Sequence, residues 1–75
     1  MKLSEIQVGR YYSNGRDLVR LVLNTIDSGK ALRYRTVAKT RGRGRVGDER
    51  VVVTQDFADW AVTDVTGQWV NVKGA

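Results

Sequence analysis

Apolar positions alternate with polar ones over short stretches of this chain, which is the pattern of β-strands. The first two such stretches, Arg10–Ser13 and Leu18–Ile26, flank Asn14-Gly15, the dipeptide that most favours a tight hairpin turn. A third stretch, Ala31–Thr40, follows the turn sequence Asp27-Ser28-Gly29-Lys30. The pattern therefore predicts three successive antiparallel strands joined by short turns.

The third predicted strand has two different faces. Its alternate positions form an apolar set and a mainly basic set: Leu32, Tyr34, Thr36 and Ala38 against Arg33, Arg35, Val37 and Lys39. Because successive side chains of a strand point to opposite faces of a sheet, one set should pack in the core while the other meets solvent. The sequence thus predicts a basic surface on this strand.

The second half of the chain predicts a long loop, a strand and a helical turn. Residues 41–48 contain too many glycines and charges to pack, and we expect a mobile hairpin tip before the β-branched strand Glu49–Thr54. Asp56 can then cap a helical turn over Phe57–Ala61, in which apolar residues recur at the spacing of one helical face. One or two closing strands are expected within 62–65 and 68–72.

Five or six short strands and one helical turn, in a chain of 75 residues, most simply close into a small antiparallel barrel without free edges. This order of elements resembles the SH3-like barrel group. Four segments also resemble small uncharacterised phage and plasmid proteins: Val8–Tyr12, Leu18–Val22, Arg33–Arg35 and Phe57–Ala61. We therefore predict a single SH3-like barrel domain over 1–75, with a lead-in at 1–9 and a frayed tail at 73–75.

The net charge is concentrated in one segment. Residues 30–50 carry eight basic and two acidic side chains, a balance of +6, whereas the rest of the chain sums to −1 and the whole chain to +5. Such a local positive field attracts anionic partners, of which phosphate backbones are the commonest.

Composition argues against catalysis. The chain has no histidine and no cysteine, which removes the usual general base, most metal ligands, disulfides and cofactor-holding thiolates. We accordingly predict no enzyme activity, no catalytic residue, no metal and no cofactor. The apolar runs are too short for a signal peptide or a membrane span, so a cytoplasmic protein without membrane contact is expected.

The candidate binding residues lie on the basic strand, in the loop after it and at two aromatic positions. Arg50, on the strand that returns from this loop, is expected to continue the same basic surface. Arginines separated by glycines offer bidentate donors to phosphate or to a guanine edge, and an exposed ring can stack on a base. Tyr11 and Tyr12 should point to opposite sides, so only one is expected to be exposed, whereas Tyr34, Phe57 and Trp60 are assigned to the core. The candidates are Arg33, Arg35, Lys39, Arg41, Arg43, Arg45, Arg50, Tyr12 and Trp69.

Two classes of function fit these residues. The first is a non-catalytic module that binds the phosphates of DNA or RNA with little sequence preference. The second is a phage or mobile-element module that docks its basic loop on an acidic host or defence protein, or that captures an anionic nucleotide. A homo-oligomer is compatible with either, because the core of so short a chain is small.

Overall fold

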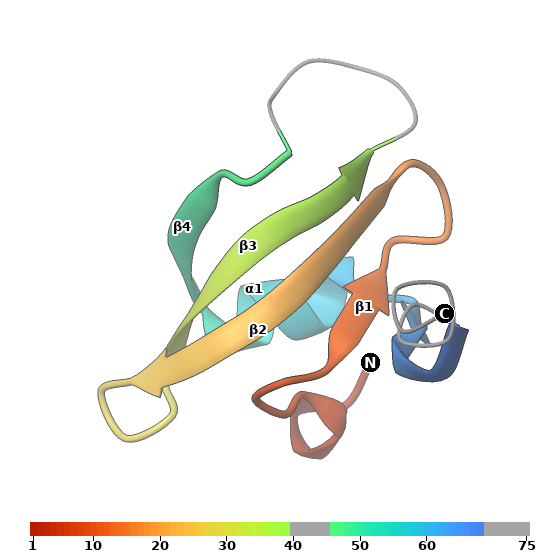
Figure 1. The fold of residues 1–75 in the computed structure, drawn as a ribbon. Coiled ribbons are helices and arrows are strands. Elements are labelled where there is room, and N and C mark those ends of the chain that lie inside the picture. The colour runs from red at the N-terminus through yellow and green to blue at the C-terminus, as the bar shows by residue number, and fades with distance from the viewer. Residues whose placement is uncertain (40–45, 69–75) are drawn as a thin grey trace.

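The computed structural model describes residues 1–39 and 46–68. Within them, five strands form one antiparallel sheet in the order β4-β3-β2-β1-β5 (Figure 1). The predicted mainly β fold is therefore confirmed. The elements in chain order are η1 (Leu3–Glu5), β1 (Tyr11–Ser13), β2 (Leu18–Ile26), β3 (Ala31–Lys39), β4 (Glu49–Val53), α1 (Thr54–Trp60) and β5 (Thr63–Asp64).

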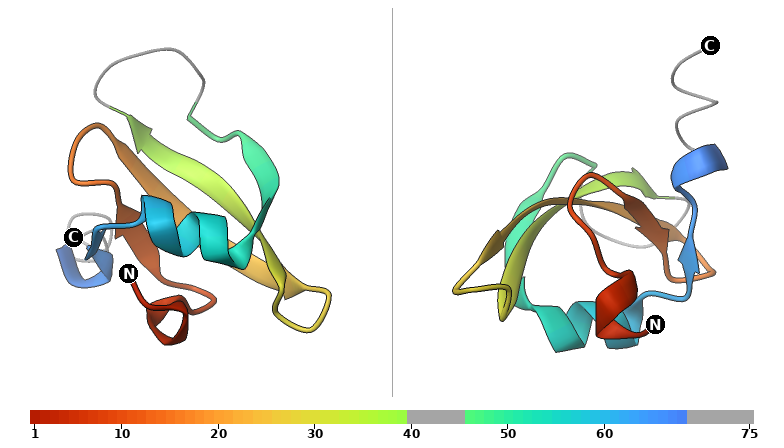
Figure 2. Two further views of the ribbon diagram at one scale, coloured as in Figure 1. Left: turned by 180° about the vertical axis from the view of Figure 1, so that it is seen from behind. Right: turned by 90° about the horizontal axis from the view of Figure 1, so that it is seen from below.

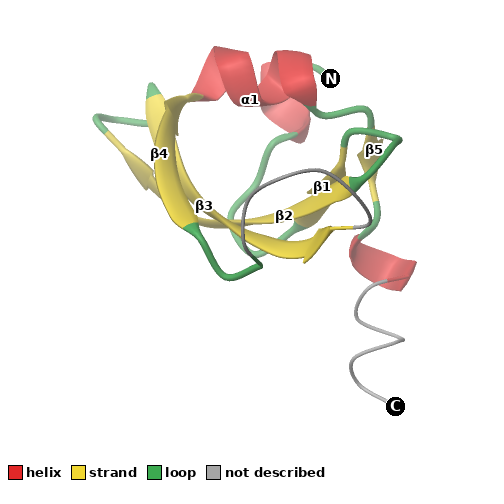
Figure 3. Ribbon diagram, turned by 90° about the horizontal axis from the view of Figure 1, so that it is seen from above, coloured by secondary structure: helices red, strands yellow, loops and turns green. Residues whose placement is uncertain are grey.

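The sheet is strongly curved, and both α1 and the short 3₁₀ helix η1 lie on its concave side (Figures 2 and 3). We call this side the inner face; it carries the buried side chains of Tyr12, Val22, Leu32 and Tyr34. The opposite, convex side is the outer face, which α1 and η1 leave uncovered. Directly paired strand residues share a face, so the strand register assigns each side chain to one of the two.

Phe57 of α1 lies at the centre of the core. Its ring centroid is 5.6 Å from that of Tyr12, 5.7 Å from that of Tyr34 and 5.3 Å from that of Trp60. Aromatic pairs at these distances add favourable edge and tilted contacts to the burial of their apolar surface. The assignment of Tyr34 and Phe57 to the core is thus confirmed, whereas Trp60 is partly buried and packs against this core.

Tyr12 also belongs to the core, and the prediction that its ring is exposed is wrong. Its exposed fraction is 0%, and its hydroxyl donates to the carbonyl of Glu5 at 2.6 Å and accepts from the backbone N–H of Gln7 at 2.8 Å. The sheet register places Tyr12 opposite Arg20 on the inner face, so it is Tyr11 that points outward. These two hydrogen bonds connect the segment around η1 to strand β1 of the sheet.

The helix begins earlier than the sequence pattern indicates. Thr54 starts α1, and its backbone N–H donates to the carbonyl of Lys30 while its hydroxyl donates to that of Gly29. These contacts with the β2–β3 turn end the strand at Val53, although threonine favours strands. Val53 is the N-cap residue and makes no side-chain cap, so the predicted cap by Asp56 is wrong; Asp56 instead lies in the first turn, where its charge favours the helix dipole.

The predicted closed barrel is not confirmed. Within the described residues β4 and β5 are the two edges of the sheet and do not pair with each other. α1 follows directly on β4 and crosses the inner face, so a helix seals the core where a closed barrel would use a further strand pairing (Figure 2). The register shifts after Val19 and Val22 interrupt the β2–β3 ladder within this curved sheet.

An ion pair holds β5 against the start of β1. The Nε of Arg10 donates to the carboxylate of Asp64 at 2.6 Å, and Thr66 donates its backbone N–H to the same side chain at 2.9 Å. Burial raises the pKa of Asp64, but the hydrogen bonds from Arg10 and Thr66 outweigh this effect and hold the pKa below its ordinary value. The ionised carboxylate is therefore part of the folded structure.

Replacing Asp64 by asparagine should reduce stability in a pH-dependent manner. A carboxyl whose pKa is lower in the folded state stabilises the fold above its unfolded pKa of about 3.9, and this gain is lost as the pH falls through the folded pKa. We expect wild type to be more stable than Asp64→Asn at pH 7 and the difference to shrink below about pH 4. Urea unfolding across pH 2–7 measures it. A constant difference would show that the charge of Asp64 is irrelevant.

Candidate nucleic-acid interface

One of the predicted basic residues, Arg33, is exposed on the outer face. Arg33 pairs with Asn24 of β2 and with Val51 of β4, which places its side chain on the outer face near the middle of the sheet. The residue is exposed and makes no hydrogen bond or ion pair with any residue in the described part of the chain. Arg33 is thus a cation available to a ligand.

Arg35 lies two positions further along β3 on the same face, but its charge is engaged. Glu49 is its direct partner on β4, and the Glu49 carboxylate accepts from both Nη2, at 2.5 Å, and Nε, at 3.1 Å, of Arg35. This cross-strand ion pair is exposed on both sides, so it contributes little to stability. It does neutralise part of the predicted basic surface.

Arg50 does not join Arg33 and Arg35 as predicted. The β3–β4 register pairs it with Tyr34, whose side chain is buried on the inner face, so Arg50 projects to the inner side of the sheet edge. Sequence alternation on β4 alone gives no register against β3, which is why the prediction failed. Lys39 ends β3 opposite Leu18 of β2 and is partly buried.

Four further candidates, Arg41, Arg43, Arg45 and Trp69, lie outside the described residues. In sequence, the three arginines lie two, four and six positions after Lys39, the last residue of β3. Their role therefore stays a prediction from the sequence.

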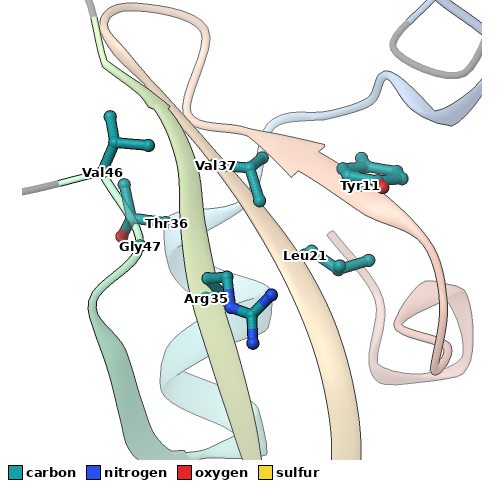
Figure 4. A pocket seen from close by; sticks show the side chains of 7 residues that line it. All are labelled: Tyr11, Leu21, Arg35, Thr36, Val37, Val46 and Gly47. Carbon is teal, nitrogen blue, oxygen red and sulfur yellow. The ribbon is translucent and has the colours of Figure 1, made fainter. Parts of the chain in front are cut away.

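A hollow of about 280 Å³ lies on the outer face beside Arg35 (Figure 4). Tyr11, Leu21 and Arg35 form a row of direct partners across β1, β2 and β3, and this row makes up one part of the wall. Tyr11, and not the predicted Tyr12, is thus the tyrosine that lies beside the basic strand on the outer face. The lining residues are Tyr11, Leu21, Arg35, Thr36, Val37, Val46 and Gly47.

The hollow combines an aromatic ring, aliphatic side chains and one guanidinium group. Such a lining offers apolar contacts to a flat group and charged donors to an anion beside it. Among residues 1–39 and 46–68, no group of histidine, cysteine or acidic side chains could hold a metal ion. The described part of the chain also contains no helix long and apolar enough to cross a membrane.

Comparison with known proteins yields no match. No protein-family model matches the chain, and neither curated proteins nor solved structures give a significant match. The resemblances to the SH3-like group and to phage and plasmid proteins therefore stay predictions.

Removing the partner of Arg35 should strengthen anion binding. Glu49→Gln deletes one negative charge from the outer face and frees the guanidinium of Arg35, while the exposed pair it breaks is worth only about 0–1 kcal/mol. We expect a several-fold higher affinity for oligonucleotides at low salt and a nearly unchanged unfolding midpoint. Fluorescence anisotropy and urea unfolding measure the two. An affinity equal to or below that of wild type would remove Arg35 from the interface.

Proposed function

We propose that this protein is a non-catalytic nucleic-acid-binding module whose outer face and adjoining arginine–glycine loop hold phosphates. The cations of the outer face supply the affinity, and the row of Tyr11 and Leu21 offers a surface for a base or sugar. Because phosphate contacts carry no sequence information, weak sequence preference and strong salt dependence follow.

The observation that carries this proposal is that Arg33, within the basic segment 30–50, is an exposed cation without an acidic partner in the described part of the chain. Within the described residues of that segment, Glu49 binds Arg35, whereas Arg33 has no acidic partner. The segment holds a charge of +6, and the outer face is free of the helices that cover the inner one. A surface that served only solubility would need no such segregation of one sign of charge.

The test is a titration of the protein into fluorescent single-stranded DNA, duplex DNA and RNA of one length at several salt concentrations. We expect micromolar or tighter affinity at 50 mM salt that falls linearly on a double-logarithmic plot. Arg33→Gln should reduce the magnitude of that slope by about one, the contribution of one phosphate contact. Lys2→Gln is the matched control, because it removes one exposed charge from the inner side beside η1.

Absence of binding at low salt to all three nucleic acids would refute the proposal. Equal effects of Arg33→Gln and Lys2→Gln would also contradict it, because they would show a response to net charge without a defined surface. The preferred form among the three identifies the natural class of ligand.

Docking on an acidic protein is the second candidate, and the apolar part of the outer face favours it. Val51 and Val53 of β4 are 56% and 54% exposed, and they lie on the same side of the sheet as Arg33. Exposed apolar residues beside cations are typical of protein interfaces. This candidate predicts no nucleic-acid binding and a stable one-to-one complex that Val51→Ser weakens.

We also infer kinship with the SH3-like barrel group. The order of three strands, a fourth strand, a short helix and a final strand supports it, as does the antiparallel pairing of the sheet. Small barrels of this kind host many binding functions, so the kinship does not select between the two candidates.

A further inference from the structure

Arg20 occupies an unusual position on the inner face. Its guanidinium carbon lies 4.4 Å from the ring centroid of Tyr34 and 4.1 Å from that of Trp60, the last residue of α1. On β2 it pairs with Tyr12 on one side and with Thr36 on the other, and both of these residues are buried. The two aromatic rings therefore fix the plane of the guanidinium group at the margin of the core.

No acidic residue in the described part of the chain forms an ion pair with Arg20. The residue makes no hydrogen bond or ion pair with the described residues, and its Nε is buried without an acceptor. Asp17 exerts some attraction, but its carboxylate accepts a hydrogen bond from Asn14 at 3.0 Å within the β1–β2 turn. Aromatic rings attract a cation through their faces, but they provide no lone pairs for its N–H groups. The N–H donors of Arg20 therefore have no acceptor among the described residues.

A second cation acts on Arg20 from the same side of the sheet. Arg50 pairs with Tyr34 and thus projects to the same side of the sheet as Arg20. Burial lowers the pKa of Arg20 below its ordinary value, and repulsion from the exposed Arg50 acts in the same direction. Two guanidinium groups on the same side of the sheet repel each other when no carboxylate is shared between them. An anion that binds between them replaces this repulsion by attraction.

We propose that Arg20, Arg50 and Trp60 form a binding site for a phosphate group on the inner side of the sheet, at the end of α1. Arg20 supplies a fork of donors that Tyr34 and Trp60 hold in place, and Arg50 supplies a second cation from the solvent side. Phosphate fits better than a single carboxylate, because its three or four oxygens can accept from both guanidinium groups at once. The site lies on the face opposite Arg33 and does not depend on the outer-face interface.

A purely structural role for Arg20 makes a different prediction. In that case the guanidinium serves only to cover the rings, and methionine, an unbranched side chain that also packs against aromatic rings, would replace it without consequence for any ligand. The distinction therefore needs a readout of binding at Trp60 itself and not only of stability.

The experiment follows the indole N–H resonance of Trp60 and the Nε–H resonance of Arg20 by NMR during titration with sodium phosphate, pyrophosphate and a short oligonucleotide. Sodium chloride at matched ionic strength is the reference. The proteins compared are wild type, Arg20→Met, Arg20→Lys, Arg50→Gln and, as the matched control, Arg16→Met, which removes an exposed cation of the β1–β2 turn. Urea unfolding of each variant confirms that it is folded.

We expect saturable shifts of both resonances with at least one phosphate compound and not with chloride. Arg20→Met should abolish the Trp60 response, Arg20→Lys and Arg50→Gln should weaken binding about tenfold, and Arg16→Met should leave it unchanged. A response to phosphate or pyrophosphate alone identifies a small phosphorylated ligand; a response to the oligonucleotide at equal phosphate concentration identifies a nucleic-acid backbone. Shifts that do not saturate, that chloride reproduces or that persist in folded Arg20→Met would overturn the proposal.

Discussion

Replacement of Phe57 by alanine is expected to lower the free energy of unfolding by about 3–5 kcal/mol. The side chain is 1% exposed and touches the rings of Tyr12, Tyr34 and Trp60, so its loss leaves a cavity that three rigid neighbours cannot refill. A domain of this length has a total stability of roughly 4–11 kcal/mol. The substitution therefore removes much of the stability or all of it.

Urea unfolding followed by circular dichroism measures this effect. Val8→Ala is the control, because Val8 is 53% exposed and its truncation should change stability by no more than about 0.5 kcal/mol. Phe57→Leu should fall between the two, since it keeps part of the apolar volume. A loss below about 1 kcal/mol for Phe57→Ala would mean that the sheet is stable without the helix against it.

The largest expected effect on binding comes from replacing Arg33, Arg41, Arg43 and Arg45 together by glutamine. Each phosphate contact contributes about 0.7–0.9 to the salt slope, so four lost contacts flatten it by about three and lower the affinity at 50 mM salt about a hundredfold or more. Arg33 is the member of this set whose exposure and lack of a partner the structure describes; the other three follow from the sequence. Anisotropy titrations over a range of salt concentrations give both quantities.

The matched control replaces the same four arginines by lysine. Lysine keeps the charge but lacks the planar fork of donors, so most of the salt slope should remain while the affinity at fixed salt falls modestly. A fourfold lysine variant as weak as the glutamine variant would indicate base-edge recognition by the guanidinium groups. A glutamine variant that binds like wild type would exclude these residues from the interface.

The strands of this fold can be predicted from local sequence. Asn14-Gly15 marks the first hairpin, the alternation after Lys30 separates the buried Leu32 and Tyr34 from the exposed Arg33 and Arg35, and each assignment agrees with the structure. These features depend on the alternation of apolar and polar residues and on the residues of the turn, and both are properties of short sequence segments.

The composition of the site depends on register between strands, which local patterns do not contain. Because Glu49 pairs with Arg35, it neutralises part of the basic outer face. Because Arg50 pairs with Tyr34, its side chain lies on the inner side of the sheet. Likewise, the choice of Tyr12 for the core follows from its pairing with Arg20. The contact of Arg20 with Trp60 joins residues 40 positions apart; the sequence signal was an arginine on the same face as Val22, a buried position.

Among residues 1–39 and 46–68 the open sheet has two unequal edges, and this limits how the protein can assemble through its backbone. β5 is two residues long and offers few groups to a new strand, whereas β4 presents five residues without proline, including Val51 and Val53. Pairing of β4 with β4 of a second copy consumes the longer edge of both molecules. Association along this edge therefore stops at a two-fold dimer and does not grow into a filament.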